Sequence, residues 1–313
     1  MALYKGKYQK SPGWVKVIQW LGIMAVLTLV AMGVWLIIPC NHASTEALKW
    51  FQFMQTIGTF LLPPFICAWL WSENPLQWLH LASHQTSNIK HQTSPFLYGA
   101  AIVLMIVAMP GINLLADWNS RMVLPECMAG IEAWMKAQEN AAMALTERFL
   151  AGTSIGVLVV NIGLMALLPA CAEELTFRGV VMGLFNVERL TFSGKRAHVA
   201  VWVTAILFSA IHMQFYGFVP RMLLGALFGY ALLWTGSLWV PIVMHFTNNC
   251  VTVVAYWCIY RTGINPETIE TFGTGDTAWV GAVSIVLVGI GIYFFWRRSR
   301  QMRRASSRMS EGS

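Results

Sequence analysis

Hydrophobic stretches of membrane-spanning length recur along the whole chain and are separated by short polar segments. A helix needs about 20 apolar residues to cross the hydrocarbon core of a bilayer, and an open sheet edge cannot satisfy its backbone groups in lipid. The pattern therefore predicts an all-α polytopic membrane protein, built as a bundle of about eight transmembrane helices around a polar cavity. The predicted spans are residues 15–38, 48–71, 96–115, 153–187, 199–215, 218–235, 238–260 and 279–296.

Composition and charge support this class and predict an orientation. Of the 313 residues, 57% are hydrophobic and 11% are charged, which is too apolar for a soluble domain. Basic residues concentrate near both ends of the chain, and acidic residues gather on the opposite side of the predicted spans. The positive-inside rule then places both termini in the cytoplasm. The net charge of +7 reflects topology and contact with anionic lipid, so we expect no nucleic-acid partner.

We expect a single membrane domain with three parts. Residues 1–148 hold the N-terminal spans and an outer loop, residues 149–260 a catalytic core, and residues 261–313 the last span and a basic cytoplasmic tail. The first span lacks a small-residue cleavage site behind a short apolar core, so it is expected to be an uncleaved anchor. The first part contains no embedded charge, which is typical of a scaffold.

Two features are predicted on the outer face. The segment 116–146 carries apolar residues among charges and alanines, which indicates either a helix on the membrane surface or a cap over the site. Cys40 and Cys127 also fall on this side, where an oxidising compartment could join them.

The longest apolar stretch, residues 153–187, would measure on the order of 50 Å as one straight helix, which exceeds a bilayer. Pro169 is expected to break it, leaving either a kinked crossing or an outer turn followed by a shorter span. Counted from the cytoplasmic loops, Glu173 and His212 match at a depth of about 21 to 22 Å, and His245 lies about 12 Å deep. The sequence thus predicts one site that is reached from the cytoplasm or laterally near it.

Two glutamates and an arginine interrupt this stretch in Cys171-Ala-Glu-Glu-Leu-Thr-Phe-Arg178. A charge deep in a bilayer costs between about 2.5 and well over 10 kcal/mol, so such residues usually face a wet cavity and mark a functional site. Glu174 and Arg178 are spaced to pair on a helix, whereas Glu173 points about a quarter turn away. We interpret the pair as support and Glu173 as a desolvated general base. The alternative is a buried ion network that only fixes helix packing.

Each of two later apolar stretches carries one histidine, in Phe208-Ser-Ala-Ile-His212 and in His245-Phe-Thr-Asn-Asn249. His212 is expected on a helix whose other faces are apolar, and His245 and Asn249 share a helix face one turn apart. A lone intramembrane histidine is often only hydrogen-bonded to a neighbouring helix. Two histidines together with a carboxylate pair and an asparagine favour a functional site.

These residue types suit acyl-transfer chemistry on a peptide bond inside the membrane. Glu173 and His212 would activate water, and His245 with Asn249 would donate hydrogen bonds to the oxyanion. Glu173, His212 and His245 are also typical ligands of a divalent metal such as zinc, whose bound water would then be the nucleophile. The sequence lacks both His-Glu-x-x-His and Gly-x-Ser-x-Gly, and Ser209 has no evident base one turn away.

Three motifs carry a resemblance to a known family: Glu173-Glu174-x-x-x-Arg178, Phe208-x-x-x-His212 and His245-x-x-x-Asn249. In type and order they resemble the motifs of the CAAX prenyl protease type II and bacteriocin-processing (CPBP) family of intramembrane endopeptidases, which includes the Ras-converting enzyme. The resemblance covers residues 172–260. It implies an eight-helix bundle with a cavity open to the cytoplasmic side, and the water-activating and oxyanion roles given above. It leaves the metal open, because the family is described both as metalloproteases and as glutamate proteases.

The leading prediction is therefore a protease that cleaves a membrane-associated or lipidated peptide or protein, with that substrate and the lipid bilayer as its partners. The alternative is a non-catalytic membrane scaffold or bacteriocin-immunity protein that retains the fold. A proton-coupled transporter is disfavoured because no internal repeat is detectable. The short loops and the basic tail favour the inner (plasma) membrane of a prokaryote.

Overall fold

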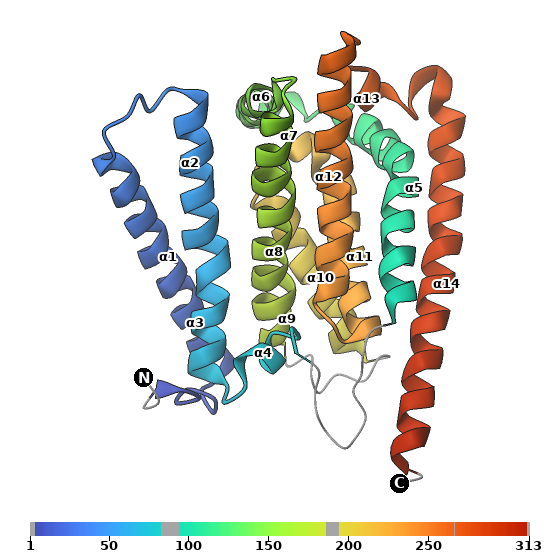
Figure 1. Ribbon diagram of the computed structural model, residues 1–313. Helices are drawn as coiled ribbons and strands as arrows, with labels where there is room; N and C mark the ends of the chain where they lie inside the picture. Colours follow the sequence, from blue (N-terminus) through green and yellow to red (C-terminus); the bar gives the residue numbers. More distant parts are fainter. Residues whose placement is uncertain (1–3, 83–93, 186–193, 266, 312–313) are drawn as a thin grey trace.

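The computed structural model describes residues 4–82, 94–185, 194–265 and 267–311. Within these residues the chain forms helices and no strand (Figure 1). Seven helical segments of the described chain are long and apolar enough to cross a membrane, so the protein is an all-α polytopic membrane protein. They are Gly13–Ile37, Thr45–Trp71, Pro95–Ser120, Ile155–Leu184, Phe215–Thr235, Trp239–Thr262 and Gly275–Gln301.

The spans divide into simple and compound helices. The long single helices are α1 (Gly13–Ile37), α5 (Pro95–Ser120), α11 (Phe218–Thr235), α12 (Trp239–Thr262) and α14 (Ala278–Glu311). The compound spans are α2 (Thr45–Thr56), η2 (Ile57–Leu61) and α3 (Leu62–Trp71), and then α7 (Ile155–Asn161), η4 (Ile162–Leu167), α8 (Leu168–Glu174), η5 (Leu175–Val181) and α9 (Met182–Leu184). The other helices are α4 (Pro75–Trp78), α6 (Ala129–Leu150), α10 (Lys195–Ala210) and α13 (Glu267–Thr271), with short 3-10 turns η3 (Glu126–Met128), η7 (Phe215–Gly217) and η8 (Gly275–Thr277).

The span from α7 to α9 continues through Pro169, so the expected break at this proline is wrong. Proline lacks an N–H group, and its ring clashes with the carbonyl four residues earlier in a regular α-helix. Here the segment directly before α8 is the π-helical turn η4, which is wider than an α-turn and accommodates the proline. A second π-helical segment, η5, follows the glutamates at the end of α8. Glu173 and Glu174 therefore lie between two π-helical segments, η4 and η5.

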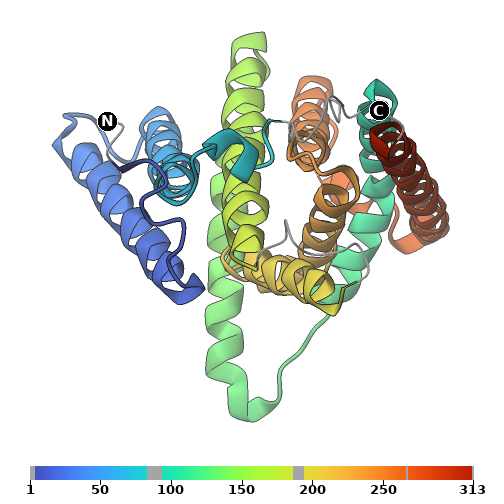
Figure 2. The same cartoon turned by 90° about the horizontal axis from the view of Figure 1, so that it is seen from below.

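The helices that carry the three motifs lie in the middle of the bundle. Figure 2 shows α1 to α3 at one edge and α5 with α14 at the other, and α12 contacts α5, α8, α11 and η4 between them. Gly225 lets α11 approach α10 closely, because a Cβ atom there would lie 3.2 Å from Ala205 Cα and 3.1 Å from the Phe208 ring. Small residues at such contacts are how membrane helices pack without a hydrophobic driving force.

The eighth span expected from the sequence, residues 199–215, corresponds to α10, which has 16 residues and ends at Ala210. The chain then turns, with Met213 at φ 56°, and enters η7 and α11. The expectation that His212 lies on a helix is therefore wrong, because it occupies this turn. The apolar run continues past the end of α10, so hydropathy does not mark the turn.

The outer segment contains α6, which lies crosswise at the end of the bundle opposite both chain termini (Figure 1). The ring centroids of Trp134 and Phe215 are 5.3 Å apart, and Glu139 Oε2 accepts a hydrogen bond of 3.1 Å from the Tyr216 N–H. Through these contacts α6 covers the connection between α10 and α11, as a cap would. Near its start, a hydrogen bond from Lys136 lowers the pKa of Glu132.

Cys40 and Cys127 are separate, exposed thiols in the structure. The disulfide considered for the outer face is therefore not formed.

Candidate active site

Glu173 and Glu174 lie at the end of α8, directly before the π-helical segment η5. Because they are adjacent on a helix, their side chains reach different neighbours. Glu174 is fully buried, whereas Glu173 lines a pocket. The structure thus agrees with the sequence prediction that Glu174 faces Arg178 while Glu173 points toward different neighbours.

Glu174 belongs to a buried hydrogen-bonded chain. Arg178 Nη1 donates to Glu174 Oε1 at 2.8 Å, and Nη2 donates to the Gly225 carbonyl oxygen at 2.8 Å. Nδ1 of His245 lies 2.9 Å from the same Glu174 oxygen, a contact that the sequence did not predict. The Arg178 guanidinium also lies 4.6 Å from the centroid of the Phe208 ring. This chain locks three helices together and fixes the orientation of the His245 ring.

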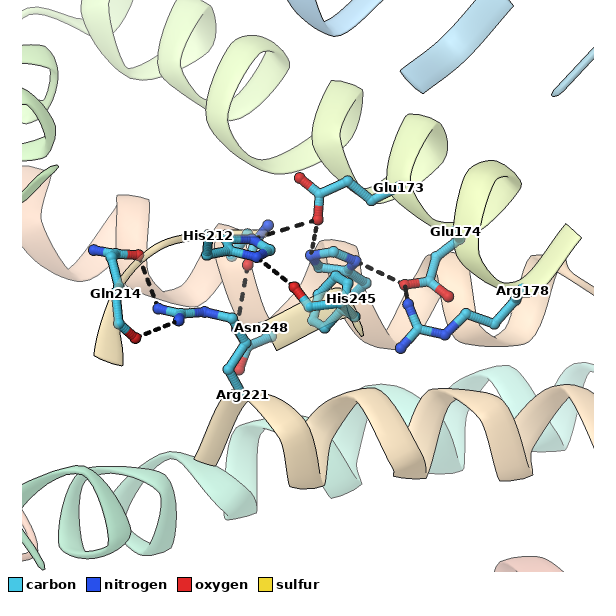
Figure 3. Close-up of polar contacts among 10 residues, drawn as sticks. Glu173, Glu174, Arg178, His212, Gln214, Arg221, His245 and Asn248 are labelled. Atoms are coloured by element: carbon cyan, nitrogen blue, oxygen red, sulfur yellow. Dashed lines mark hydrogen bonds and ion pairs between the residues drawn. The ribbon is translucent and has the colours of Figure 1, made fainter. Parts of the chain in front are cut away.

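Glu173 lies on the other side of His245 and faces two imidazoles (Figure 3). Its Oε2 is 3.8 Å from Nε2 of His212 and 3.9 Å from Nε2 of His245. Nδ1 of His212 lies 2.7 Å from the Phe208 carbonyl oxygen, which holds the ring of this turn residue toward Glu173. Among the described residues, Glu173 Oε2 is buried and has no hydrogen-bond partner.

Two asparagines of α12 complete the cluster. Asn249 lines the pocket as the sequence predicted, together with its neighbour Asn248. Asn248 Nδ2 donates to Asn249 Oδ1 at 3.2 Å, so the carbonyl side of the Asn249 amide is engaged. The amide nitrogen of Asn249, a two-proton donor, then remains for other acceptors.

The pocket that joins these groups has a volume of about 450 Å³, within the range of ligand pockets in proteins. Its lining runs from Glu173 and His245 through Thr252 of α12 to Thr146 and Leu150 of α6. The chain termini lie at the opposite end of the bundle (Figure 1). The pocket extends toward the end that carries α6, whereas the sequence predicted access from the side of the termini or laterally near it.

Sequence reasoning gave no role in the site to several polar residues of the pocket wall, namely Gln52, Thr146, Gln214, Arg221, Asn248 and Thr252. A signal for Arg221 was present, because it is the single charged residue in the apolar stretch 218–235. Asn248 is one turn from His245 on the same helix and could have been found by that spacing. Gln52 comes from a scaffold span, and nothing in its local sequence marks it.

The three residues expected as alternative metal ligands converge without the spacing of a metal site. Two ligands at about 2.0 Å from a tetrahedral zinc are about 3.3 Å apart. The separations from Glu173 Oε2 to the nitrogens of His212 and His245 are 3.8 Å and 3.9 Å. Over the described part of the chain, no group of three or more His, Cys, Asp or Glu side chains is arranged to hold a metal ion.

Comparisons with known proteins address the family. Residues 155–251 match the family described as type II CAAX prenyl endopeptidase Rce1-like, and all three motifs lie within the match. A protein of Bacillus subtilis (strain 168) named "Uncharacterized protein YpbD" is 30% identical over 91 residues, which cover 28% of this chain and 41% of that protein. The matched region thus spans less than half the length of this relative. No solved structure matches the chain. Residues 155–251 therefore form a domain of the Rce1-like family of type II CAAX prenyl endopeptidases, which is a protease family.

Proposed function

We propose that this protein is an intramembrane endopeptidase that hydrolyses a peptide bond of a membrane-associated or lipidated peptide, with water activated by Glu173 and His212. The observation that carries the proposal is the position of Glu173 Oε2 between Nε2 of His212 and Nε2 of His245, at 3.8 Å and 3.9 Å, inside the pocket. Both distances exceed a direct hydrogen bond and suit a shared water molecule.

The hydrogen bonds on the far side of each imidazole favour one tautomer. Nδ1 of His212 faces the Phe208 carbonyl oxygen and Nδ1 of His245 faces the Glu174 carboxylate, so both Nδ1 atoms donate. In the neutral rings Nε2 is then an acceptor on the side of Glu173. Glu173 Oε2 and Nε2 of His212 can then accept the two protons of one water molecule, which is the arrangement for general-base activation.

In the proposed reaction, the water oxygen attacks the carbonyl carbon while Glu173 or His212 takes a proton from it. Asn249 and protonated His245 donate hydrogen bonds to the carbonyl oxygen, which gains negative charge. His245 donates from Nε2 only as an imidazolium, in which Nδ1 also donates, to the Glu174 carboxylate. The C–N bond then breaks, and the proton passes to the leaving amine.

The proposed orientation keeps both termini in the cytoplasm, because the basic residues concentrate on that side. With this orientation, the pocket extends toward the extracytoplasmic end of the bundle, where α6 lies. The substrate would therefore reach Glu173 from the outer side or from the outer part of the bilayer.

The test of activity is cleavage of a fluorogenic apolar peptide by the purified full-length protein in lipid nanodiscs. Glu173→Gln keeps the volume of the side chain and removes the base, so it should lower the rate by at least about 10²-fold. Glu126→Gln is the matched control, since Glu126 is exposed and lies outside the pocket. Equal rates for wild type and Glu173→Gln would overturn the proposal.

Metal dependence is tested on the same assay. Water activation by Glu173 and His212 predicts an unchanged rate after treatment with a chelator and removal of the chelated metal. A loss of activity that added zinc restores would replace this mechanism with metal-bound water.

The orientation is tested with a membrane-impermeant thiol reagent and a background without native cysteines. Thr252→Cys, in the pocket wall, should react in right-side-out vesicles, and Gln9→Cys, near the N-terminus, only in inverted ones. The opposite pattern for both positions would reverse the orientation, and labelling of both from the same side would contradict the location of the pocket.

A further inference from the structure

Arg221 faces the pocket at the His212 end of the cluster, away from the buried Arg178 (Figure 3). Arg221 belongs to the first turn of α11 and lines the same pocket as Glu173. Its Nη1 donates to the Gln214 carbonyl oxygen at 3.1 Å, and its Nη2 donates to Gln214 Oε1 at 2.8 Å. Both partners are neutral, so they orient the guanidinium without cancelling its charge.

The partners of Arg178 and Arg221 differ. Arg178 is paired with a carboxylate at 2.8 Å and is fully buried. No carboxylate among the described residues lies within 4.0 Å of Arg221; Glu139 and Glu173 act on it only from a greater distance. Glu139 is itself engaged by the Tyr216 N–H. The Arg221 charge is therefore available to a ligand that enters the pocket.

Two features of the position make a purely structural role unfavourable. A cation in the first turn of a helix opposes the helix dipole, whose positive end lies there. Burial of an arginine without a carboxylate partner adds a desolvation cost. The guanidinium fits at this position because residue 217 is a glycine. A Cβ atom on Gly217 would lie only 3.3 Å from Arg221 Nη2. The helix N-terminus and the cation both attract a negative group to the same place.

We propose that Arg221, oriented by Gln214, binds a carboxylate of the peptide substrate and so determines which peptide bond reaches Glu173. An arginine fork matches a carboxylate with two parallel hydrogen bonds, which makes it selective for that group. The carboxylate can come from the free C-terminus of the peptide or from an Asp or Glu side chain near the cleaved bond. This inference rests on the proposed function, and it names the substrate class as peptides with a carboxylate close to the scissile bond.

The first experiment compares three fluorogenic peptides of one apolar sequence, using wild-type protein in nanodiscs. One peptide has a free C-terminal carboxylate, one is amidated, and one is amidated with a single Asp near its end. The wild type should show a kcat/KM at least about tenfold higher for one of the carboxylate peptides than for the amidated one. The preferred peptide identifies the source of the carboxylate.

Arg221→Gln should reduce this kcat/KM ratio to about one, and Arg221→Lys should retain part of it, because lysine keeps the charge without the fork. The matched control is Arg261→Gln, since Arg261 is exposed at the other end of α12 from the pocket's charged cluster. A ratio near one in the wild type, or a ratio unchanged by Arg221→Gln, would overturn the inference. Either result leaves cleavage itself intact.

A binding measurement separates this inference from the catalytic proposal. Fluorescence anisotropy of the labelled carboxylate and amidated peptides with Glu173→Gln protein reports affinity without turnover. The carboxylate peptide should bind at least about tenfold more tightly, and adding Arg221→Gln should remove the difference. Equal affinities for the two peptides would refute carboxylate recognition even if wild-type protein cleaves both. A preserved preference in a protein without peptidase activity would instead refute only the proposed function.

Discussion

The two sides of His245 differ in how closely their charged groups contact one another and in whether they line the pocket. On one side, Glu174 and Arg178 are fully buried, and each contacts a charged or polar partner at 2.8 to 2.9 Å. On the other side, Glu173 faces His212 and His245 at 3.8 and 3.9 Å across a pocket. The first region is a fully buried network of direct contacts, in which Glu174 Oε2 and Arg178 Nε still lack a hydrogen-bond partner among the described residues. The second region, the pocket side, leaves acceptors and donors accessible to a ligand. Adjacent carboxylates on one helix can thus serve stability and chemistry separately.

The largest effect is expected from disrupting the buried network of Glu174, Arg178 and His245. Arg178→Ala leaves Glu174 buried without its partner, which should cost about 3 to 5 kcal/mol of folding free energy and abolish cleavage. Unfolding of the nanodisc-free, detergent-solubilised protein, followed by tryptophan fluorescence, measures the loss. Arg261→Ala, at an exposed site, is the control. A stable and active Arg178→Ala protein would show that the network is dispensable.

The second prediction compares His245, which contacts Glu174 of the buried network, with His212, which lies on the pocket side only. His245→Ala removes the Glu174 contact and a ring packed 5.3 Å from Phe228, so it should lower both stability and activity. His212→Ala, in the turn after α10, should lower the cleavage rate by about 10² to 10⁴-fold with little change in stability. Thermal unfolding and peptide cleavage are measured on the same preparations. Equal loss of stability in both variants would contradict the distinction between a buried network that stabilises the fold and a pocket side that serves catalysis.

The sequence predicted the Glu174–Arg178 pair and a single site shared by Glu173, His212, His245 and Asn249, but it predicted neither the third partner of the pair nor the end of the bundle toward which the pocket extends. The Glu174–Arg178 pair follows from i, i+4 spacing, which is a local property of any helix. The third partner, His245, comes from a helix 71 residues away, and the sequence pattern gives no distance between them. The all-α membrane fold follows from span-length apolar stretches, since lipid leaves the backbone no other choice.

The turn at His212 and the side of access depend on tertiary structure. Apolar residues such as Ile211, Met213 and Phe215 continue past the end of α10, so the hydropathy pattern does not mark the helix boundary. Depth was counted along straight helices, and the count does not show which side a pocket opens to. The π segment before Pro169 illustrates the same limit, because proline chemistry predicts a disturbance but not whether the helix continues.

The third prediction tests whether the pocket side supplies a hydrogen-bond donor to the oxyanion. Asn249→Ala removes an amide from the pocket wall and should lower kcat by about 10² to 10³-fold, the cost of losing one oxyanion donor. KM should change little, since the lost hydrogen bond forms mainly in the transition state. Thr252→Val, one turn from Asn248 on the same helix, is the matched polar-to-apolar control. A rise in KM with unchanged kcat would assign Asn249 to substrate binding instead.

The smallest effect is expected at Asn248, where the comparison is sharpest. Its Nδ2 donates to Asn249 Oδ1, while its own Oδ1 is buried without a hydrogen-bond partner among the described residues. Asn248→Leu should therefore leave stability equal or higher, because it removes an unsatisfied buried acceptor.

The same substitution releases the Asn249 amide, so kcat should fall by about five- to tenfold, the worth of one hydrogen bond of roughly 1 kcal/mol. In Asn249→Ala protein, adding Asn248→Leu should then cause no further loss, because the amide it orients is gone. Independent, multiplying losses in the double variant would mean that Asn248 acts on the substrate directly. A drop in stability would mean that Asn248 stabilises the fold, as the buried network of Glu174 and Arg178 does, rather than serving the pocket side that holds Glu173.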